Sequence, residues 1–150
     1  MTNELFILIL AVHLYTTIFM TGVIWIIQLV HYPMFTDLDA RFFEKSMKDH
    51  QKGMSQVVLI TMLIEIFTGA SLIIFSQGVS FLIILNFIAL LVIWFVTFMI
   101  SVPCHNRLLI SKNNDVIKKL VQSNWIRTVL WSIRSIGLLY FILGKIMVTL

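Results

Sequence analysis

Several residues capable of acid–base, metal-binding or ion-pair chemistry lie within or beside long apolar segments of the chain. His31, His50 and His105 each lie at the edge of such a segment, and His13 and Glu65 lie inside the first and second segments. Neutral imidazole is a common ligand of zinc, copper and iron, and three histidines leave one coordination position open for a substrate. Because a bilayer excludes ionisable groups that serve no purpose, these residues indicate a polar site inside a membrane-embedded fold.

Two arginines extend this candidate site along the last apolar segment. At about 1.5 Å per residue, Glu65 lies about 20 Å into its helix and Arg134 about 15 Å into its own, so the two can pair. A purely structural ion pair is the alternative, and His13 is another candidate partner for Glu65. Arg127, together with Asn124, would hold an anionic or carbonyl group. We assign Glu65, Arg127 and Arg134 to the catalytic machinery.

The three edge histidines are candidate ligands of a transition metal (Fe, Cu or Zn) or of haem. Haem needs two axial ligands, and His31 with His105 is the better pair. Gln28, one helical turn before His31, could support a bound metal through a hydrogen bond, and Cys104 is a candidate soft ligand. The segments carry no His-x-x-His, His-x-x-x-His or Glu-x-x-His pair. Proton shuttling by the histidines, or ordinary contacts with lipid headgroups, therefore stay open.

Aromatic residues beside Arg127 complete the candidate ligand site. Trp125 and Trp131 flank this arginine and could stack on it or on a flat ligand. Their ordinary role would be in the bundle core or at the membrane interface. We assign ligand binding to these two tryptophans together with Gln28, Asn124 and His13.

The composition is that of a membrane protein. The chain has 150 residues, of which 59% are hydrophobic and 12% charged, whereas soluble domains carry about 25% charged residues. The mean hydropathy is +0.98. The net charge of +4 does not indicate nucleic acid, because the basic residues lie beside apolar segments, where they meet lipid headgroups. The single cysteine excludes an internal disulfide and a Cys-x-x-Cys metal motif.

Four apolar segments are long enough to cross a bilayer, which takes about 20 helical residues. They cover approximately residues 5–30, 53–75, 79–102 and 122–149. We expect Pro33 and Pro103 to end the first and third helices, because proline lacks the N–H that continues a helix. The short Ser76-Gln77-Gly78 turn predicts that the second and third helices are antiparallel neighbours. The last helix can begin earlier, with a cap at Asn113, Asn114 or Asp115.

The distribution of basic residues predicts the orientation of the chain. The loops at 31–52 and 103–121 contain most of them: Arg41, Lys45, Lys48 and Lys52 in the first, Arg107, Lys112, Lys118 and Lys119 in the second. The positive-inside rule places both loops in the cytoplasm and both termini outside. We therefore expect a multi-pass protein of the bacterial inner membrane, with the three edge histidines on the cytoplasmic side.

Polar residues recur every three or four positions in each segment, which places them on one face of a helix. His13, Thr17 and Thr21 form such a face in the first segment, and Glu65 with Thr68 forms one in the second. In lipid such faces turn toward the bundle interior, although hydroxyl and amide side chains also simply join helices. The predicted fold is an all-α integral membrane four-helix bundle, antiparallel up-down-up-down, in a single domain over residues 1–150.

The candidate residues also form an extended pattern. It reads Gln28-x-x-His31-Tyr32-Pro33-x-Phe35, then His50, Glu65, Pro103-x-His105-x-x-Leu108 and Asn124-Trp125-x-Arg127-Thr128-x-x-Trp131. The pattern covers most of the chain and resembles a group of small four-helix bacterial membrane proteins without an assigned activity. The proline-to-leucine turn and the Asn-x-x-Arg of the last segment are more distantly similar to the anthrone-oxygenase-like family.

That distant resemblance implies a four-helix membrane fold. For some members of the family it also implies oxidation of polycyclic aromatic substrates without a known cofactor. The chain departs from the family at His105, where asparagine is expected, and in the His31-Tyr32-Pro33 segment.

From these observations we expect an integral membrane oxidoreductase that acts on a lipophilic substrate entering between the helices. The alternative is a non-enzymatic protein: a transporter, a ligand-binding protein or an accessory subunit of a membrane complex. Membrane lipids and a lipophilic small molecule are the expected partners, and a homo-oligomer is compatible with the sequence. A bundle whose polar core only fixes helix register is the third interpretation.

Overall fold

A computed structural model describes residues 2–75 and 80–149, and this part of the chain contains helices and no strands. The first helical segment comprises α1 (Asn3–Ile26), a π-helical turn η1 (Ile27–His31) and α2 (Tyr32–Asp37). The second is α3 (Ala40–Ile74), and the third comprises α4 (Phe81–Val96), η2 (Thr97–Ser101) and α5 (Val102–Leu108). The fourth is α6 (Asn114–Thr149). The all-α prediction is confirmed.

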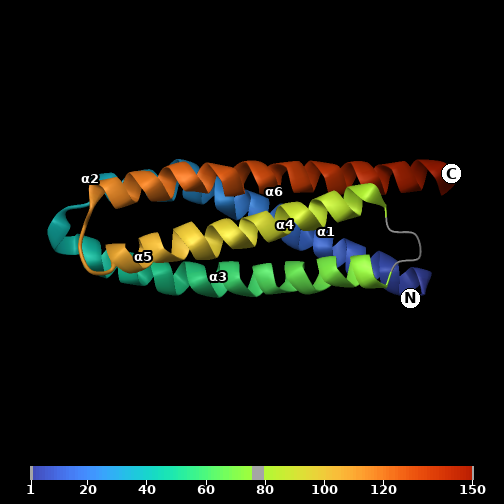
Figure 1. Cartoon of the computed structure of the whole chain (residues 1–150), viewed down its shortest axis with the longest axis horizontal. Coiled ribbons are helices and arrows are strands. Elements are labelled where there is room, and N and C mark those ends of the chain that lie inside the picture. Colours follow the sequence, from blue (N-terminus) through green and yellow to red (C-terminus); the bar gives the residue numbers. More distant parts are fainter. Residues whose placement is uncertain (1, 76–79, 150) are drawn as a thin grey trace.

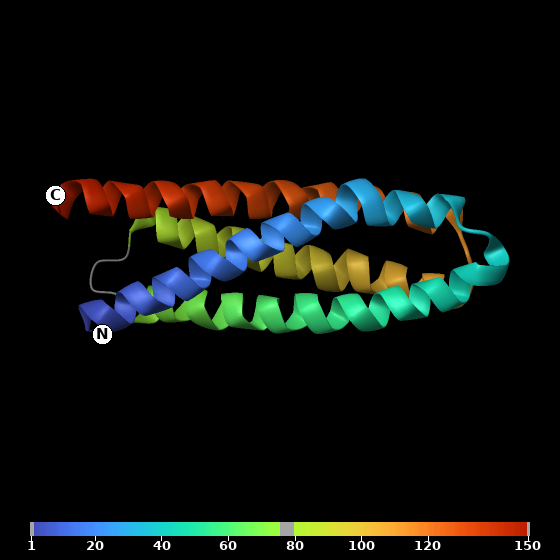
Figure 2. The same cartoon turned by 180° about the vertical axis from the view of Figure 1, so that it is seen from behind.

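The four segments form an elongated antiparallel bundle (Figure 1). Around its axis α1 packs against α3 and α6, and α4 packs against α6 and less extensively against α3. The start of α1 and the end of α6 lie at one end of the bundle, whereas the connections from α2 to α3 and from α5 to α6 lie at the other (Figures 1 and 2). The latter end, which we call the loop end, is where the three edge histidines are found.

All four segments are long and apolar enough to cross a membrane. Large apolar side chains such as Ile7, Phe67, Phe95 and Ile136 are exposed on the outside of the bundle. The polar faces predicted from sequence point inward: His13, Thr17, Glu65, Asn86, Asn124, Arg127, Thr128 and Arg134 are all buried. This inside-out distribution is what a lipid environment favours, because polar groups in hydrocarbon must find partners within the protein.

The expectation that Pro33 and Pro103 end their helices is wrong. Each proline follows a π-helical turn and lies in the first turn of the next α-helix. In these turns the N–H of Tyr32 donates to the Ile27 carbonyl and that of Val102 to the Thr97 carbonyl, five residues back. The wider turn removes the clash that a proline ring makes with the carbonyl four residues before it. The chain therefore continues as helix through both prolines.

The helices consequently extend well into the regions predicted as loops. α3 begins at Ala40 rather than near residue 53, after Asp39, whose carboxylate accepts a hydrogen bond from the Arg41 N–H at 2.9 Å. α6 begins at Asn114, and the Asn113 side-chain oxygen caps it by accepting from the N–H groups of Asp115 and Val116 at 3.0 and 3.1 Å. The structure thus selects Asn113 among the three predicted caps. The predicted turn at residues 76–78 lies outside the described residues.

Candidate functional site

Glu65 and Arg134 form an ion pair at the centre of the bundle. Arg134 Nη1 lies 2.8 Å from Glu65 Oε1, and both side chains are essentially inaccessible to solvent. Thr17 donates to the same carboxylate oxygen at 2.8 Å, and the Trp131 indole N–H donates to the other at 3.1 Å. Both oxygens of this carboxylate are therefore hydrogen-bonded, which is what a charge buried in a low-dielectric interior requires.

His13 and Asn86 complete this inner network. Asn86 Oδ1 accepts from Arg134 Nε at 3.1 Å, while the Asn86 amide donates to the Arg134 carbonyl at 3.1 Å. His13 Nδ1 lies 2.8 Å from the Thr68 hydroxyl, and His13 Nε2 lies 3.4 Å from Arg134 Nη2. Residues of α1, α3, α4 and α6 thus meet in one network, and each of the charged or ring groups in it has a partner.

Arg127 lies seven residues before Arg134 on α6, and it is 4% exposed. Its Nη1 donates to the Ser101 hydroxyl at 3.2 Å, and its guanidinium carbon lies 5.4 Å from the centre of the Trp131 ring. Within residues 2–75 and 80–149 the ion pairs are those of Arg41, Lys48 and Arg134, so no carboxylate of this part of the chain pairs with Arg127. Trp131 connects the inner network with Arg127, because its N–H donates to Glu65 and its ring packs on the Arg127 guanidinium.

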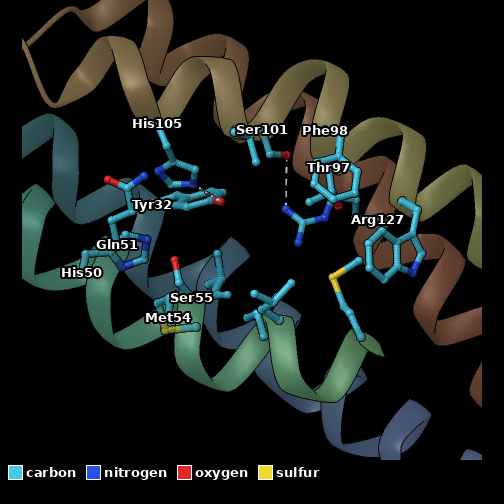
Figure 3. A pocket seen from close by; sticks show the side chains of 16 residues that line it. Tyr32, His50, Gln51, Met54, Ser55, Thr97, Phe98, Ser101, His105 and Arg127 are labelled. Atoms are coloured by element: carbon cyan, nitrogen blue, oxygen red, sulfur yellow. Dashed lines mark hydrogen bonds between the residues drawn. The ribbon is translucent and has the colours of Figure 1, made fainter. Parts of the chain in front are cut away.

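A cavity of about 260 Å³ lies beside Arg127, between α3 and the α4–η2–α5 segment. Its walls include the apolar residues Met54, Val58, Met62, Trp94 and Phe98. Its polar lining comes from Tyr32, His50, Gln51, Ser55, Thr97, Ser101, His105 and Arg127. Figure 3 shows the guanidinium of Arg127 pointing into this space, with Tyr32 and His105 on the side toward the loop end.

The cavity reaches the outer surface of the bundle. Leu59, Phe98 and Val102 line it, and these apolar side chains are 49%, 47% and 38% exposed. The opening therefore lies on the flank of the bundle, between α3 and η2–α5. In a membrane, an opening at this position would face the lipid.

The three edge histidines gather at the loop end. The ring centres of His31 and His50 are 4.6 Å apart, and those of His50 and His105 are 5.5 Å apart. Tyr32 joins them, because its hydroxyl lies 3.2 Å from His105 Nε2. Across the described ranges, no group of three or more His, Cys, Asp or Glu residues is arranged to hold a metal ion. Metal or haem ligation by these histidines thus stays a prediction.

Unpaired polar atoms concentrate around the cavity. Among the described residues, five buried side-chain nitrogen or oxygen atoms lack a hydrogen-bond partner. Four of them belong to residues that line the cavity: His50 Nδ1, Trp94 Nε1, His105 Nδ1 and Arg127 Nε. Buried polar groups are normally paired, so these four atoms are available to hydrogen-bond a molecule in the cavity.

Other residues assigned to the site from sequence lie outside the cavity. The Asn124 amide donates to Gln28 Oε1 at 2.8 Å, so these two buried side chains join α6 to η1. Trp125 is 42% exposed and packs edge-on against Trp25, 5.7 Å away. His13, Glu65, Trp131 and Arg134 belong to the inner network described above, and His31 contacts the cavity residue His50.

Sequence reasoning assigned no ligand-binding role to Tyr32, Trp94, Thr97 or Ser101, which the structure places around the cavity. Tyr32 and Ser101 lie one and two residues before the two prolines. The signal that could have found them is the proline itself, because a π-helical turn next to a proline shifts the following side chains around the helix, and such turns occur frequently at functional sites.

Comparison of the chain with protein-family models, with curated proteins and with solved structures gives no match.

Proposed function

We propose that this protein is an integral membrane protein whose cavity binds a lipophilic small molecule carrying hydrogen-bond acceptors. The observation that carries the proposal is the cavity between α3 and α4–η2–α5, with apolar walls and a group of polar side chains that lack partners. Ligand sites have this composition in general: mostly apolar walls, with a few placed polar groups that fix orientation. The ligand enters from the lipid through the opening edged by Leu59, Phe98 and Val102.

The basic residues of the loop end support an orientation in the membrane. Arg41, Lys45, Lys48 and Lys52 come from the α2–α3 side, and Arg107, Lys112, Lys118 and Lys119 from the α5–α6 side. Under the positive-inside rule the loop end, with the polar part of the cavity, faces the cytoplasm of a bacterial cell and both termini face outside. Anionic lipid headgroups would contact these residues.

The proposal extends to oxidoreductase activity and to a bound cofactor, as the sequence predicts. The groups available in the cavity for chemistry are the Tyr32 hydroxyl, the His50 and His105 imidazoles and the Arg127 guanidinium, which serve proton transfer and electrostatic stabilisation. Oxidation of the bound molecule would need an electron acceptor in addition. Elemental analysis and an absorption spectrum of the purified protein, beside His31→Ala, His50→Ala and His105→Ala variants, would test a metal or haem. The distant resemblance to the anthrone-oxygenase-like family is compatible with oxidoreductase activity.

Ligand binding can be tested with two short amphiphiles, octanoate and 1-octanol. The protein is placed in phosphatidylcholine nanodiscs and titrated by calorimetry, and empty nanodiscs correct for partitioning. We expect a saturable heat at one molecule per chain with at least one probe. Val58→Phe fills the cavity and should abolish it, whereas Val57→Phe, at an exposed neighbouring position that does not line the cavity, should not. Heats identical to those of empty nanodiscs with both probes would refute the proposed function.

A further inference from the structure

We infer that the natural ligand is a lipophilic oxyanion, with a carboxylate-type head bound by Arg127 and an apolar tail directed toward the flank opening. This inference rests on the proposed function and names the class of ligand. It starts from a charge imbalance at the cavity. Arg127 is 4% exposed, and the part of the chain that the structure describes offers it no carboxylate.

The imbalance cannot be removed by deprotonation. A guanidinium keeps its proton in proteins, so Arg127 carries a full positive charge inside the bundle. A buried charge without a counter-ion is costly, and proteins normally pair such groups. The nearby carboxylate of Glu65 already accepts from Thr17, Arg134 and Trp131. The anion that balances Arg127 must therefore come from outside the described chain.

The surroundings of Arg127 offer hydroxyl and N–H groups but no carboxylate. The Ser101 hydroxyl accepts a hydrogen bond from Arg127 Nη1 only, and Arg127 Nε has no partner. The lining residues, all from the described ranges, include no aspartate or glutamate, while Tyr32, His105 and Trp94 contribute groups that can donate. A planar guanidinium with unused N–H groups matches the two oxygens of a carboxylate. The chemistry of the site therefore selects an anion with two or more acceptor oxygens.

The remainder of the cavity suits an apolar tail. The lining also includes Met54, Val58, Leu59, Met62 and Phe98, of which Leu59 and Phe98 are exposed at the flank opening. The Trp131 ring, 5.4 Å from the guanidinium carbon, stabilises Arg127 through a cation–π contact but brings no negative charge. With its head group at Arg127 and its tail along these side chains, the ligand would lie in the cavity between α3 and the α4–η2–α5 segment.

The test compares octanoate with 1-octanol in the same nanodiscs, using wild type and two Arg127 variants. In wild type, octanoate should bind about tenfold or more tightly than octanol, since a charge-assisted hydrogen bond is about twice as strong as a neutral one. Arg127→Gln should weaken octanoate binding by about tenfold or more and leave octanol within about twofold. Arg127→Lys should retain part of the octanoate affinity, because it keeps the charge but loses the planar fork. Arg107→Gln, which removes an exposed arginine that does not line the cavity, is the matched control and should leave both affinities unchanged.

The outcomes separate this inference from the proposed function. Equal affinities for octanoate and octanol, unchanged by Arg127→Gln, would overturn the oxyanion assignment while leaving a lipophile-binding cavity. A headgroup source is distinguished by repeating the titration in phosphatidylglycerol nanodiscs. Loss of the octanoate signal there, together with lipid retention that depends on Arg127, would assign the site to a membrane phosphate and overturn the carboxylate-bearing small molecule. Wild-type protein that binds neither probe would refute the proposed function itself.

Discussion

Arg127 and Arg134 lie two helical turns apart on the buried face of α6, and only Arg134 has a carboxylate partner within the described chain. The two arginines have nearly equal exposure, 4% and 1%. The same helix therefore carries a neutralised cation and an unneutralised one in similar surroundings. Arg134 stabilises the fold, because its ion pair with Glu65 ties α6 to α3. Arg127 has no such role, because a buried charge without a counter-ion lowers stability until an anion binds.

This difference predicts unequal effects on stability when each arginine is replaced with methionine. Arg134→Met leaves Glu65 buried without its counter-ion and should reduce the free energy of unfolding by about 3–5 kcal/mol. Arg127→Met removes an unneutralised buried charge and should change stability by less than about 1 kcal/mol, or raise it. Thermal unfolding in detergent without added ligand measures both. A loss at Arg127→Met as large as that at Arg134→Met would contradict the interpretation.

A double-mutant cycle tests the central ion pair itself. Glu65→Gln keeps the shape of the side chain, but its single amide oxygen can accept from only one of Thr17 and Trp131, and it lacks the charge that balances Arg134. Each single variant should be destabilised by several kcal/mol, and the double variant Glu65→Gln with Arg134→Met should be less destabilised than the sum. Additive losses in denaturant unfolding would show that the two side chains do not interact.

Gly69 of α3 is required by the close approach of side chains from α1 and α4. A Cβ atom at this position would lie 2.9 Å from a Phe87 ring carbon and 3.1 Å from His13 Cε1. The His13 ring is fixed by its contacts with Thr68 and Arg134, so it cannot move away freely. Gly69→Ala should therefore destabilise the bundle by about 1–3 kcal/mol through overpacking. Gly22→Ala, with nothing within 4 Å, is the matched control. Alanine favours helix over glycine, so the control should be neutral or stabilising; equal losses at both positions would contradict the packing argument.

Much of this arrangement could be predicted from the sequence, because a lipid environment makes polar spacing informative. The inward faces of the helices followed from the three- and four-residue spacing of polar residues, and the Glu65–Arg134 pair followed from matched depth. The gathering of His31 with His50 and of His50 with His105 followed from their positions at segment edges. Each of these expectations depends only on helix geometry and on which groups hydrocarbon excludes.

The cavity could not be predicted in the same way. Its walls depend on where α3 and α4 separate and on the two π-helical turns, which rotate Tyr32 and Ser101 relative to a regular helix. The prediction that the helices end at Pro33 and Pro103 placed Tyr32 at the start of a loop, so it gave Tyr32 no part in a binding site. Asn124 and Trp125 lie outside the cavity, where they contact Gln28 and Trp25, so their assignment to a ligand stays a prediction.

The cap at the start of α6 gives a prediction independent of the cavity. The Asn113 side chain accepts hydrogen bonds from the N–H groups of Asp115 and Val116, which have no partner within the helix. Asn113→Ala should cost about 0.5–2 kcal/mol of stability, whereas Asn113→Ser should cost little. Asn114→Ala, one residue later, is the control, and thermal unfolding is the measurement. A larger loss at Asn114→Ala than at Asn113→Ala would place the cap elsewhere.

The hydroxyl of Tyr32 connects the cavity to the histidines, and removing it separates packing from hydrogen bonding. Tyr32→Phe keeps the ring, which packs 5.9 Å from those of His105 and Phe35, but removes the 3.2 Å contact with His105 Nε2. We expect a stability loss of about 0.5–1.5 kcal/mol, the net contribution of one hydrogen bond.

The tautomer of His105, read from the nitrogen chemical shifts of labelled histidine, should change because Nε2 loses its partner. Phe35→Leu, which alters ring packing without touching the hydroxyl, is the control for that spectrum. An unchanged His105 signal in Tyr32→Phe would mean that the hydroxyl does not set the state of this imidazole, and Tyr32 would then belong to the packing of the loop end alone.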